Sequence, residues 1–309
     1  MTTHDDTREP GQRPTRHIDA RTASPAVDHV LITRFNLPTP GPEGRVRQRE
    51  GWLTDRVGLF EKYCLPSVRA QTNQNFRWLI YFDPDSPEWL IRRLSPYVRD
   101  QVFEPIYRAE VTPSIILDDI RSGPTTPSAD LLTTNLDNDD GLAADFVDRL
   151  QRVQTNGPRS ALYLASGLIL GPDGLFLRVD RLNAFCSVRE TWEDPVTCWA
   201  DWHTLLPRSM PSVTAFGPPA WLQVVHGSNV SNRVRGRLVA SNGYTALFPT
   251  LPNDLSQPTR SDLLHDHLLR GPVRLLRESC RAAVKATLLF LVGKSGVDRI
   301  KAWRGGEAS

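Results

Sequence analysis

The fold is decided by the stretch Leu131-Leu-Thr-Thr-Asn-Leu-Asp-Asn-Asp-Asp-Gly141. Residues 131–136 are expected to form a strand, and three carboxylates follow within four residues, at Asp137, Asp139 and Asp140. A helix is expected directly after them, over residues 142–153. A strand, a polar turn and a helix in this order make up part of a βαβ unit, from which parallel sheets are built.

The same alternation continues on both sides of this stretch. Strands are expected at 29–35, 76–82, 102–107 and 161–170, and helices at 55–71 and 88–98, with Pro66 marking a break near the end of the first helix. Residues 172–250 are short apolar pieces rich in Trp, Pro and Ser, so we expect loops and strands packed around a site there. The pattern predicts an α/β fold with a mostly parallel sheet flanked by helices.

Three regions are expected along the chain of 309 residues. Residues 1–27 hold too few apolar side chains to form a core and are predicted to be a disordered leader, residues 28–250 the folded domain, and residues 251–309 a helical, basic tail. The formal net charge is +2, yet residues 270–304 alone hold nine Lys and Arg against two acidic residues. The weakly basic total therefore hides an acidic body with a basic tail.

The tail has two interpretations. Its cations recur every three or four residues and precede an apolar block at 288–292, as on a basic amphipathic helix; they are Arg270, Arg274, Arg277, Arg281 and Lys285. Such a helix is typical of proteins that bind an anionic membrane surface. The alternative is a solvated helix packed on the folded domain. Nucleic acid is not favoured as a partner, because no aromatic stacking pattern accompanies the charge.

Several classes of protein are excluded by composition. Four cysteines without C-x-x-C spacing exclude a zinc ribbon and a disulfide scaffold and suit a reducing compartment. No apolar run is long enough to span a membrane, and the N-terminus lacks the apolar core of a secretory signal. We expect a cytoplasmic protein, peripheral at the inner face of the cell membrane if the tail binds lipid.

The acidic turn at 137–141 fits some motifs and not others. An EF-hand would need glycine where Leu142 stands, and a haloacid-dehalogenase-type hydrolase with Asp137 as nucleophile would need a hydroxyl residue where Gly141 stands. An Asx-rich turn that caps the next helix is the plain structural alternative. The remaining interpretation is a D-x-D motif that binds a divalent cation and phosphate oxygens.

Further segments along the chain, taken in order, show a resemblance to a known family. They are Thr33-Arg-Phe-Asn36, Arg56, Leu59-Phe-Glu61, Cys64-Leu-Pro-Ser67, Gln71-Thr72, Phe76-Arg-Trp-Leu79, Thr134 to Gly141, and Trp221 to Asn232. Together they resemble a bacterial rhamnosyltransferase family related to the family 2 glycosyltransferases of the GT-A fold. The resemblance covers residues 29–235, and one departure is Asn135, where that family commonly has arginine.

This resemblance implies a GT-A-like, or Rossmann-like, sheet and a metal-dependent, inverting hexosyltransferase. The enzyme would move a sugar, rhamnose by the family's label, from a nucleotide-sugar donor to a hydroxyl of a glycan or glycolipid acceptor. Mn²⁺ or Mg²⁺ would be held by Asp137, Asp139 and His226. The donor would be bound by Arg34, Arg56, Asp83, Asp85, Asp137 and Asn229.

Two carboxylates are candidates for the base that takes the proton of the acceptor hydroxyl. Glu190 occupies the place where the family tends to have a glutamate, and Asp201 is the second choice. Plain structural roles stay open: a proline-rich turn for Asp83 and Asp85, surface ion pairing for Arg56, and core packing for His226. A non-catalytic carbohydrate-binding or scaffold module of an envelope-polymer pathway is the alternative function.

Overall fold

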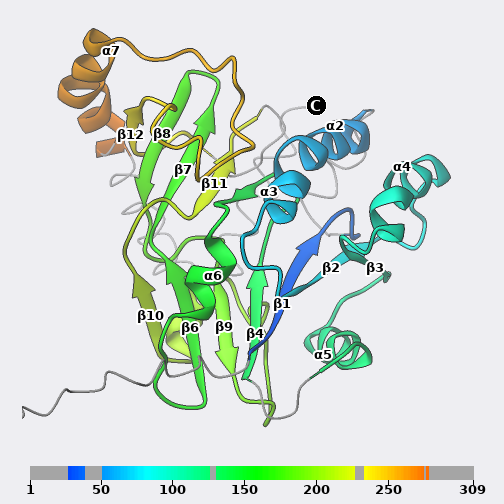
Figure 1. Cartoon of the computed structure of the whole chain (residues 1–309). Helices are drawn as coiled ribbons and strands as arrows, with labels where there is room; N and C mark the ends of the chain where they lie inside the picture. Colours follow the sequence, from blue (N-terminus) through cyan, green and yellow to red (C-terminus); the bar gives the residue numbers. More distant parts are fainter. Residues whose placement is uncertain (1–26, 39–50, 126–129, 227–232, 275, 278–309) are drawn as a thin grey trace, which may run out of the picture.

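The computed structural model describes residues 27–38, 51–125, 130–226, 233–274 and 276–277. Its larger sheet has seven strands in the order β10-β6-β9-β4-β1-β2-β3 (Figure 1). Every neighbouring pair is parallel except the two made by β9, which runs antiparallel to β4 and β6. The strands are β1 Val27–Arg34, β2 Arg77–Phe82, β3 Glu104–Tyr107, β4 Asp130–Asn135, β6 Arg159–Leu164, β9 Ser187–Glu190 and β10 Ser212–Ala215.

Alternate residues of β1 point to opposite faces of this sheet, and both faces are covered. Leu31 belongs to an apolar cluster with Val57 and Phe60 of the helices after β1. Val30 and Ile32 belong to a second cluster with Ile116 and Ile120 of another helix. Burial on both faces explains why β2 is apolar from Trp78 to Phe82, as expected for a parallel strand inside a sheet. The predicted mostly parallel sheet flanked by helices is confirmed.

The helices connect these strands as follows. The chain from β1 to β2 holds α2 Trp52–Leu59, a π-helical turn η1 Phe60–Cys64 and α3 Leu65–Arg69, and further helices are α4 Glu88–Arg99, α5 Pro113–Ser122 and α6 Phe146–Gln151. Pro66 lies in the first turn of α3. The helix continues through this proline because the winding changes in η1 just before it: Leu65 N–H donates to the Phe60 carbonyl, and Pro66 has no N–H that would need a partner.

A second sheet of five strands lies beside the first, in the order β12-β8-β7-β11-β5 (Figure 1). Its strands are β5 Gly141–Leu142, β7 Ser166–Gly171, β8 Gly174–Val179, β11 Trp221–Val224 and β12 Arg237–Val239. The predicted single strand at 161–170 is wrong, because the run divides at Ala165 into β6 of the first sheet and β7 of the second. The helix predicted from Leu142 is also shorter, since Gly141 and Leu142 pair with β11 instead.

From residue 260 on, the described part of the basic tail is helical and packs on the second sheet, whereas residues 251–259 form turns and loop. The helical part begins with α7 Arg260–His265 and η3 Asp266–Arg270 and continues to residue 274. Arg274 forms an ion pair with Asp266 at 2.7 Å, and its guanidinium lies 5.0 Å from the ring centroid of Phe176. Arg274 is therefore a packing residue and leaves the predicted cationic stripe, as the alternative of a helix packed on the folded domain predicts for this position.

Other predictions about the ends of the chain lie outside the described residues. These are the leader before Val27 and the tail beyond residue 277, with Arg281, Lys285 and the apolar block at 288–292. Within the part of the chain that the structure describes, no helix is both long and apolar enough to cross a membrane.

Candidate functional site

The acidic turn crosses from the first sheet to the second at the carboxyl end of β4. Leu136 N–H donates to the Ile32 carbonyl of β1 at 3.0 Å, and Leu142, directly after the turn, pairs with Trp221 of β11. Asp140 has no exposed surface, and its Oδ1 accepts a hydrogen bond from Val224 N–H at 2.8 Å. Burial, and then the carboxylates of Asp139 and Asp137, raise the pKa of Asp140 well above its usual value. Asp140 thus ties the turn to β11.

Asp139 and His226 meet at this turn, although they are far apart in the sequence. His226 Nε2 donates to Asp139 Oδ2 at 2.9 Å, directly after β11 ends. Burial alone would raise the pKa of Asp139, but the hydrogen bond from His226 and the positive charge of Arg56 outweigh it and hold that pKa below its usual value. Asp139 therefore carries a buried negative charge at neutral pH, in contact with an imidazole.

Arg56 supplies positive charge on the other side of the turn. Its guanidinium donates to the side-chain oxygen of Asn138 and lies 4.8 Å from the ring centroid of Trp52. The amide of Asn138 in turn donates to the carbonyls of Arg34 and Phe35, at 3.0 and 2.8 Å. The fully buried Asn138 therefore joins the acidic turn to the end of β1 and positions Arg56 beside it.

Arg34, at the end of β1, stacks on an aromatic ring that the sequence did not assign to the site. Its guanidinium lies 4.4 Å from the ring centroid of Trp199. Trp199 Nε1 donates to Asn135 Oδ1 at 2.8 Å, and the amide of Asn135 donates to the Ala184 carbonyl at 2.9 Å. Asn135, the residue that departs from the family pattern, thus fixes the tryptophan that supports Arg34. The signal in the sequence was the cluster of tryptophans at 192–221, which did not indicate which ring faces the site.

Asp83 and Asp85 follow β2 at the same edge of the sheet. Asp83 Oδ1 accepts from Asp85 N–H at 2.9 Å, and Asp83 N–H donates to the side chain of Asn36 at 3.0 Å. Since β1 and β2 are parallel neighbours, this turn lies beside the end of β1. The structure therefore brings Asp83 and Asp85 to the edge that carries the acidic turn. Asn229 lies outside the described residues.

The structure does not bring Glu190 to the site, which corrects the first choice of base. Glu190 pairs with Leu131 across β9 and β4, six residues before Asp137, or about 20 Å at about 3.3 Å per residue. Its carboxylate is almost fully buried, forms an ion pair with Arg159 at 2.8 Å and accepts from the N–H groups of Val196 and Thr197. Both oxygens are engaged in structural contacts, so Glu190 holds the segment that leads to Trp199.

Asp201 lies at the correct edge. It is exposed, accepts from Trp202 N–H at 2.7 Å, and follows Trp199 by two residues. The same segment is anchored to the strand ends, because Cys198 N–H donates to Thr133 at 2.8 Å and Tyr163 donates to the His203 carbonyl at 2.6 Å. Of the two predicted bases, only Asp201 is near the carboxyl ends of the strands.

The predicted metal ligands form a pair and not a complete set. Among the described residues no group of three His, Cys, Asp or Glu side chains is arranged to hold an ion. Asp139 and His226 contact each other. The third predicted ligand, Asp137, is exposed to solvent. Desolvation by the surrounding protein, followed by the charge of Asp139, raises the pKa of Asp137 to about 6.

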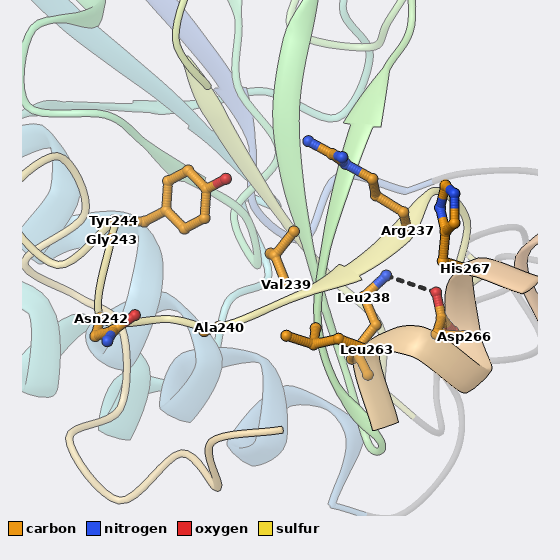
Figure 2. Close-up of a pocket in the computed structure, with 10 residues that line it drawn as sticks. All are labelled: Arg237, Leu238, Val239, Ala240, Asn242, Gly243, Tyr244, Leu263, Asp266 and His267. Carbon is orange, nitrogen blue, oxygen red and sulfur yellow. Dashed lines mark hydrogen bonds between the residues drawn. The ribbon is translucent and has the colours of Figure 1, made fainter. Parts of the chain in front are cut away.

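Two cavities lie on the second sheet. One has a volume of about 580 Å³ and is lined by residues that include His226; we call it the His226 cavity. The other, of about 520 Å³, lies between β12, residues 240–244 and α7–η3; we call it the Tyr244 cavity (Figure 2). None of the predicted site residues lines the Tyr244 cavity, whereas the wall of the His226 cavity includes His226, which contacts Asp139 of the acidic turn.

These features define a class of protein with a charged ligand site at the carboxyl edge of an α/β sheet, the usual position of ligands in such folds. Comparison with known families shows to which family the chain belongs. A family model described as "Putative rhamnosyl transferase" matches residues 28–238, and the chain belongs to this family. Membership supports a glycosyltransferase function. A search among curated proteins found no match.

Solved structures that resemble the chain are remote. "Crystal structure of S. aureus TarS 1-349" is 8% identical, with 64% of this chain and 60% of that chain covered and a TM-score of 0.37. The same fragment "in complex with UDP" is 9% identical, with the same coverage and a TM-score of 0.33. The inositol-1-phosphate CTP transferase from T. maritima is 10% identical, with 67% and 94% covered and a TM-score of 0.32. At TM-scores this low, the similarity does not indicate what this chain does.

Proposed function

We propose that the protein is a nucleotide-sugar-dependent, inverting glycosyltransferase that binds the donor's diphosphate at the acidic turn. Rhamnose is the proposed sugar, from the family's description. The observation that carries the proposal is the contact between Asp139 and His226 at 2.9 Å, with two arginines at the same turn. A carboxylate, an imidazole and guanidinium groups together suit a metal-bound diphosphate.

The charges at the turn support this position for the donor. Arg56 contacts the turn directly, and the Arg34 guanidinium is held flat on Trp199. Guanidinium groups pair well with phosphate oxygens and stabilise the negative charge that remains on a leaving diphosphate. Asp83 and Asp85, at the end of β2, would accept hydrogen bonds from ribose hydroxyls or from the N–H of a base.

The residues present fit a divalent cation completed by the donor. Mg²⁺ in phosphoryl sites is usually held by one or two protein carboxylates together with substrate phosphates. Asp139 and His226, whose side chains are 2.9 Å apart, would hold the cation, with Nε2 of His226 binding through its lone pair in place of the hydrogen bond that it donates to Asp139. The nitrogen ligand favours Mn²⁺ over Mg²⁺. When bound, the cation would act as a Lewis acid toward the diphosphate.

Asp201 is the proposed base. In the transfer the acceptor oxygen bonds to the anomeric carbon, the bond from that carbon to the diphosphate oxygen breaks, and the nucleoside diphosphate leaves with the electron pair. The proton of the acceptor hydroxyl passes to the Asp201 carboxylate. The exposed position of Asp201 at the strand ends supports this role.

The donor site is tested by the thermal stability of the full chain with UDP, dTDP or GDP, with and without Mn²⁺. At a ligand concentration of 100 times Kd, binding stabilises a protein by about 2.7 kcal/mol. We expect a Mn²⁺-dependent rise in Tm with at least one nucleotide, lost in Asp139→Asn and His226→Ala. The control is Asp145→Asn, a carboxylate a few residues further on that pairs with Arg149. No rise with any nucleotide in the wild type would refute the proposal. It would then favour the non-catalytic carbohydrate-binding module.

A peripheral position at an anionic membrane is proposed for the tail. The helix at 260–277 exposes five apolar side chains, each 47–66% exposed, namely Leu264, Leu268, Leu269, Val273 and Leu276. Exposed apolar side chains beside Arg270 and Arg277 support binding to anionic lipid. Sedimentation with anionic but not neutral liposomes is expected, and it should be lost when Leu264, Leu268 and Leu276 become serine. Equal binding to both liposome types, or to neither, would contradict this position.

A further inference from the structure

The Tyr244 cavity lies where the C-terminal helix packs on the edge of the second sheet. Its walls are β12, the turn at 240–244 and one side of α7–η3. β12 is the last strand of that sheet, and its Leu238 N–H donates to Asp266 Oδ2 of η3 at 2.9 Å. The helix therefore covers the open edge of β12, as a further strand would. The cavity is bounded by two elements that this hydrogen bond fixes to each other.

Two side chains on the wall are able to carry positive charge. Arg237 comes from β12 and His267 from η3, and both are exposed. Neither makes a hydrogen bond or an ion pair with another described residue. The wall also holds the carboxylate of Asp266, which is 3% exposed and balanced by Arg274 at 2.7 Å. Arg237 therefore gives the wall a net positive charge, to which a protonated His267 adds, and the cavity attracts an anion.

Uncharged hydrogen-bond donors line the opposite wall. Figure 2 shows the Tyr244 hydroxyl and the Arg237 guanidinium pointing toward each other across the cavity. Within the described residues, neither the Tyr244 hydroxyl nor the exposed side chain of Asn242 makes a hydrogen bond. Guanidinium, imidazole, hydroxyl and amide groups all donate hydrogen bonds, and phosphate oxygens accept them strongly from guanidinium. Donors on opposite walls suit a tetrahedral phosphate, whose oxygens point in several directions, better than a flat carboxylate.

The rest of the wall is apolar and leaves room for more than the phosphate itself. Leu238, Val239 and Leu263 line the cavity. Its volume of about 520 Å³ is within the usual range of small-molecule sites, about 300–1,000 Å³. Leu264 and Leu268, on the same helix, are 59% and 60% exposed. An organic group attached to the phosphate therefore has apolar surface to pack on, which favours a phosphate ester over the free ion.

We infer that the Tyr244 cavity binds the phosphate group of a phosphoester, through Arg237 together with His267, Tyr244 and Asn242. This site goes beyond the proposed function, because no residue of the acidic turn lines it and it needs neither a donor nor an acceptor. A soluble phosphoester and the headgroup of an anionic lipid offer the same chemistry. With a lipid, Leu264 and Leu268 would lie beside the acyl chains.

The test compares two variants of the cavity with two control variants. Arg237→Gln removes the guanidinium, and Asn242→Trp fills the cavity from an exposed position on its wall. Arg260→Gln removes the same charge from an exposed position of α7 that does not line the cavity. Arg56→Gln removes a cation of the proposed donor site. The cavity variants and Arg260→Gln replace exposed side chains, so the Tm without ligand should stay that of the wild type.

Binding is measured by saturation-transfer NMR of the full chain without Mn²⁺. The probes are glycerol 3-phosphate, glycerophosphoglycerol and dihexanoylphosphatidylglycerol below its micelle concentration, with glycerol as the uncharged control. We expect at least one phosphoester, and not glycerol, to bind the wild type. Its affinity should fall about tenfold or more in Arg237→Gln and Asn242→Trp, because hydrogen bonds to a charged group are lost, and stay within about twofold in Arg260→Gln and Arg56→Gln.

The two diesters identify the source of the phosphate, since glycerophosphoglycerol is the headgroup of phosphatidylglycerol without its acyl chains. Tighter binding of the lipid, lost when Leu264 and Leu268 become serine, assigns the cavity to a lipid headgroup. Equal or weaker binding of the lipid assigns it to a soluble phosphoester.

Other outcomes overturn the inference and leave the proposed function to its own test with nucleotide and Mn²⁺. These are no phosphoester binding by the wild type, and binding that Arg237→Gln leaves intact. Loss of binding in Arg56→Gln alone would show that the phosphate goes to the acidic turn instead. Equal losses in Arg260→Gln and Arg237→Gln would show that the effect depends on net charge and not on the cavity.

Discussion

Acidification should destabilise the fold through His29. His29 is a residue of β1, and its side chain is 2% exposed. Its Nδ1 accepts from the amide of Gln151 at 3.2 Å, so Nε2 carries the proton and donates to Thr134 Oγ1 at 2.8 Å. Burial lowers the pKa of His29 from 6.5 to about 3. The folded chain therefore keeps His29 neutral at pH values where the unfolded chain has already bound a proton.

The sign and size of the effect follow from that difference. A lowered pKa in the folded state contributes stability above pH 6.5, and this stability is lost as the pH falls from 6.5 toward 3. Between pH 7.5 and 5.5 the loss is about 1.4 kcal/mol, because the unfolded histidine becomes about nine-tenths protonated while the folded one stays neutral. His29→Gln removes this titration, so the wild type should lose about 1.4 kcal/mol more than the variant over this interval.

Urea unfolding followed by tryptophan fluorescence at the two pH values measures both proteins. The variant is expected to be less stable at every pH, since Gln does not reproduce both hydrogen bonds. The test is therefore how much the stability difference between wild type and variant changes from pH 7.5 to pH 5.5. The carboxylates titrate in the same way in both proteins, so their contribution cancels when the two stabilities are subtracted. His265→Gln, an exposed histidine of α7, is the control for replacing a histidine as such. A change in the difference below about 0.5 kcal/mol would refute the reasoning.

Three more substitutions test the contacts described above. Glu190→Gln should cost about 3 kcal/mol of stability by breaking the buried pair with Arg159, with turnover per folded molecule preserved; loss of turnover at unchanged stability would restore Glu190 as the base. Arg274→Gln leaves the buried Asp266 without its ion pair. It should speed proteolysis at 260–277, and wild-type resistance would show that the pair does not hold the helix. Trp199→Leu removes the stack under Arg34 and should raise the KM for the donor at least fivefold, whereas an unchanged KM would separate Arg34 from the donor.

Much of the larger sheet could be predicted from the sequence, because its strands are short, apolar and separated by clear turns. The second sheet could not. The run at 161–170 is buried at every residue, and only Ser166 and Gly167 interrupt its apolar side chains, which is a weak signal for a change of partners at Ala165. The β5 strand is only two residues long and depends on β11, some eighty residues later. α5 was missed although Thr112 caps it and Pro113 opens it, which is a readable start signal.

The candidate site, like the fold, could be predicted from the sequence only in part. The acidic turn and His226 could be proposed from residue type and from family resemblance, and the structure brings Asp139 and His226 together. Glu190 could not be judged from sequence, because β9 runs antiparallel to β4 and so carries its end away from the acidic turn. The support of Arg34 by Trp199 depends on a loop conformation, for which side-chain spacing gives no signal.

The division of one apolar run between two sheets at Ala165 also bears on how the chain folds. The larger sheet takes β9 and β10 from the chain after Ala165, and the smaller sheet takes β5 from the chain before it. Each sheet is therefore completed only by strands from both halves of the chain. A nascent chain released up to residue 165 would lack partners for β4 on one side and for β5 altogether. Pairings this distant in sequence close slowly, so both sheets should form in one late, cooperative step after the second half has been synthesised.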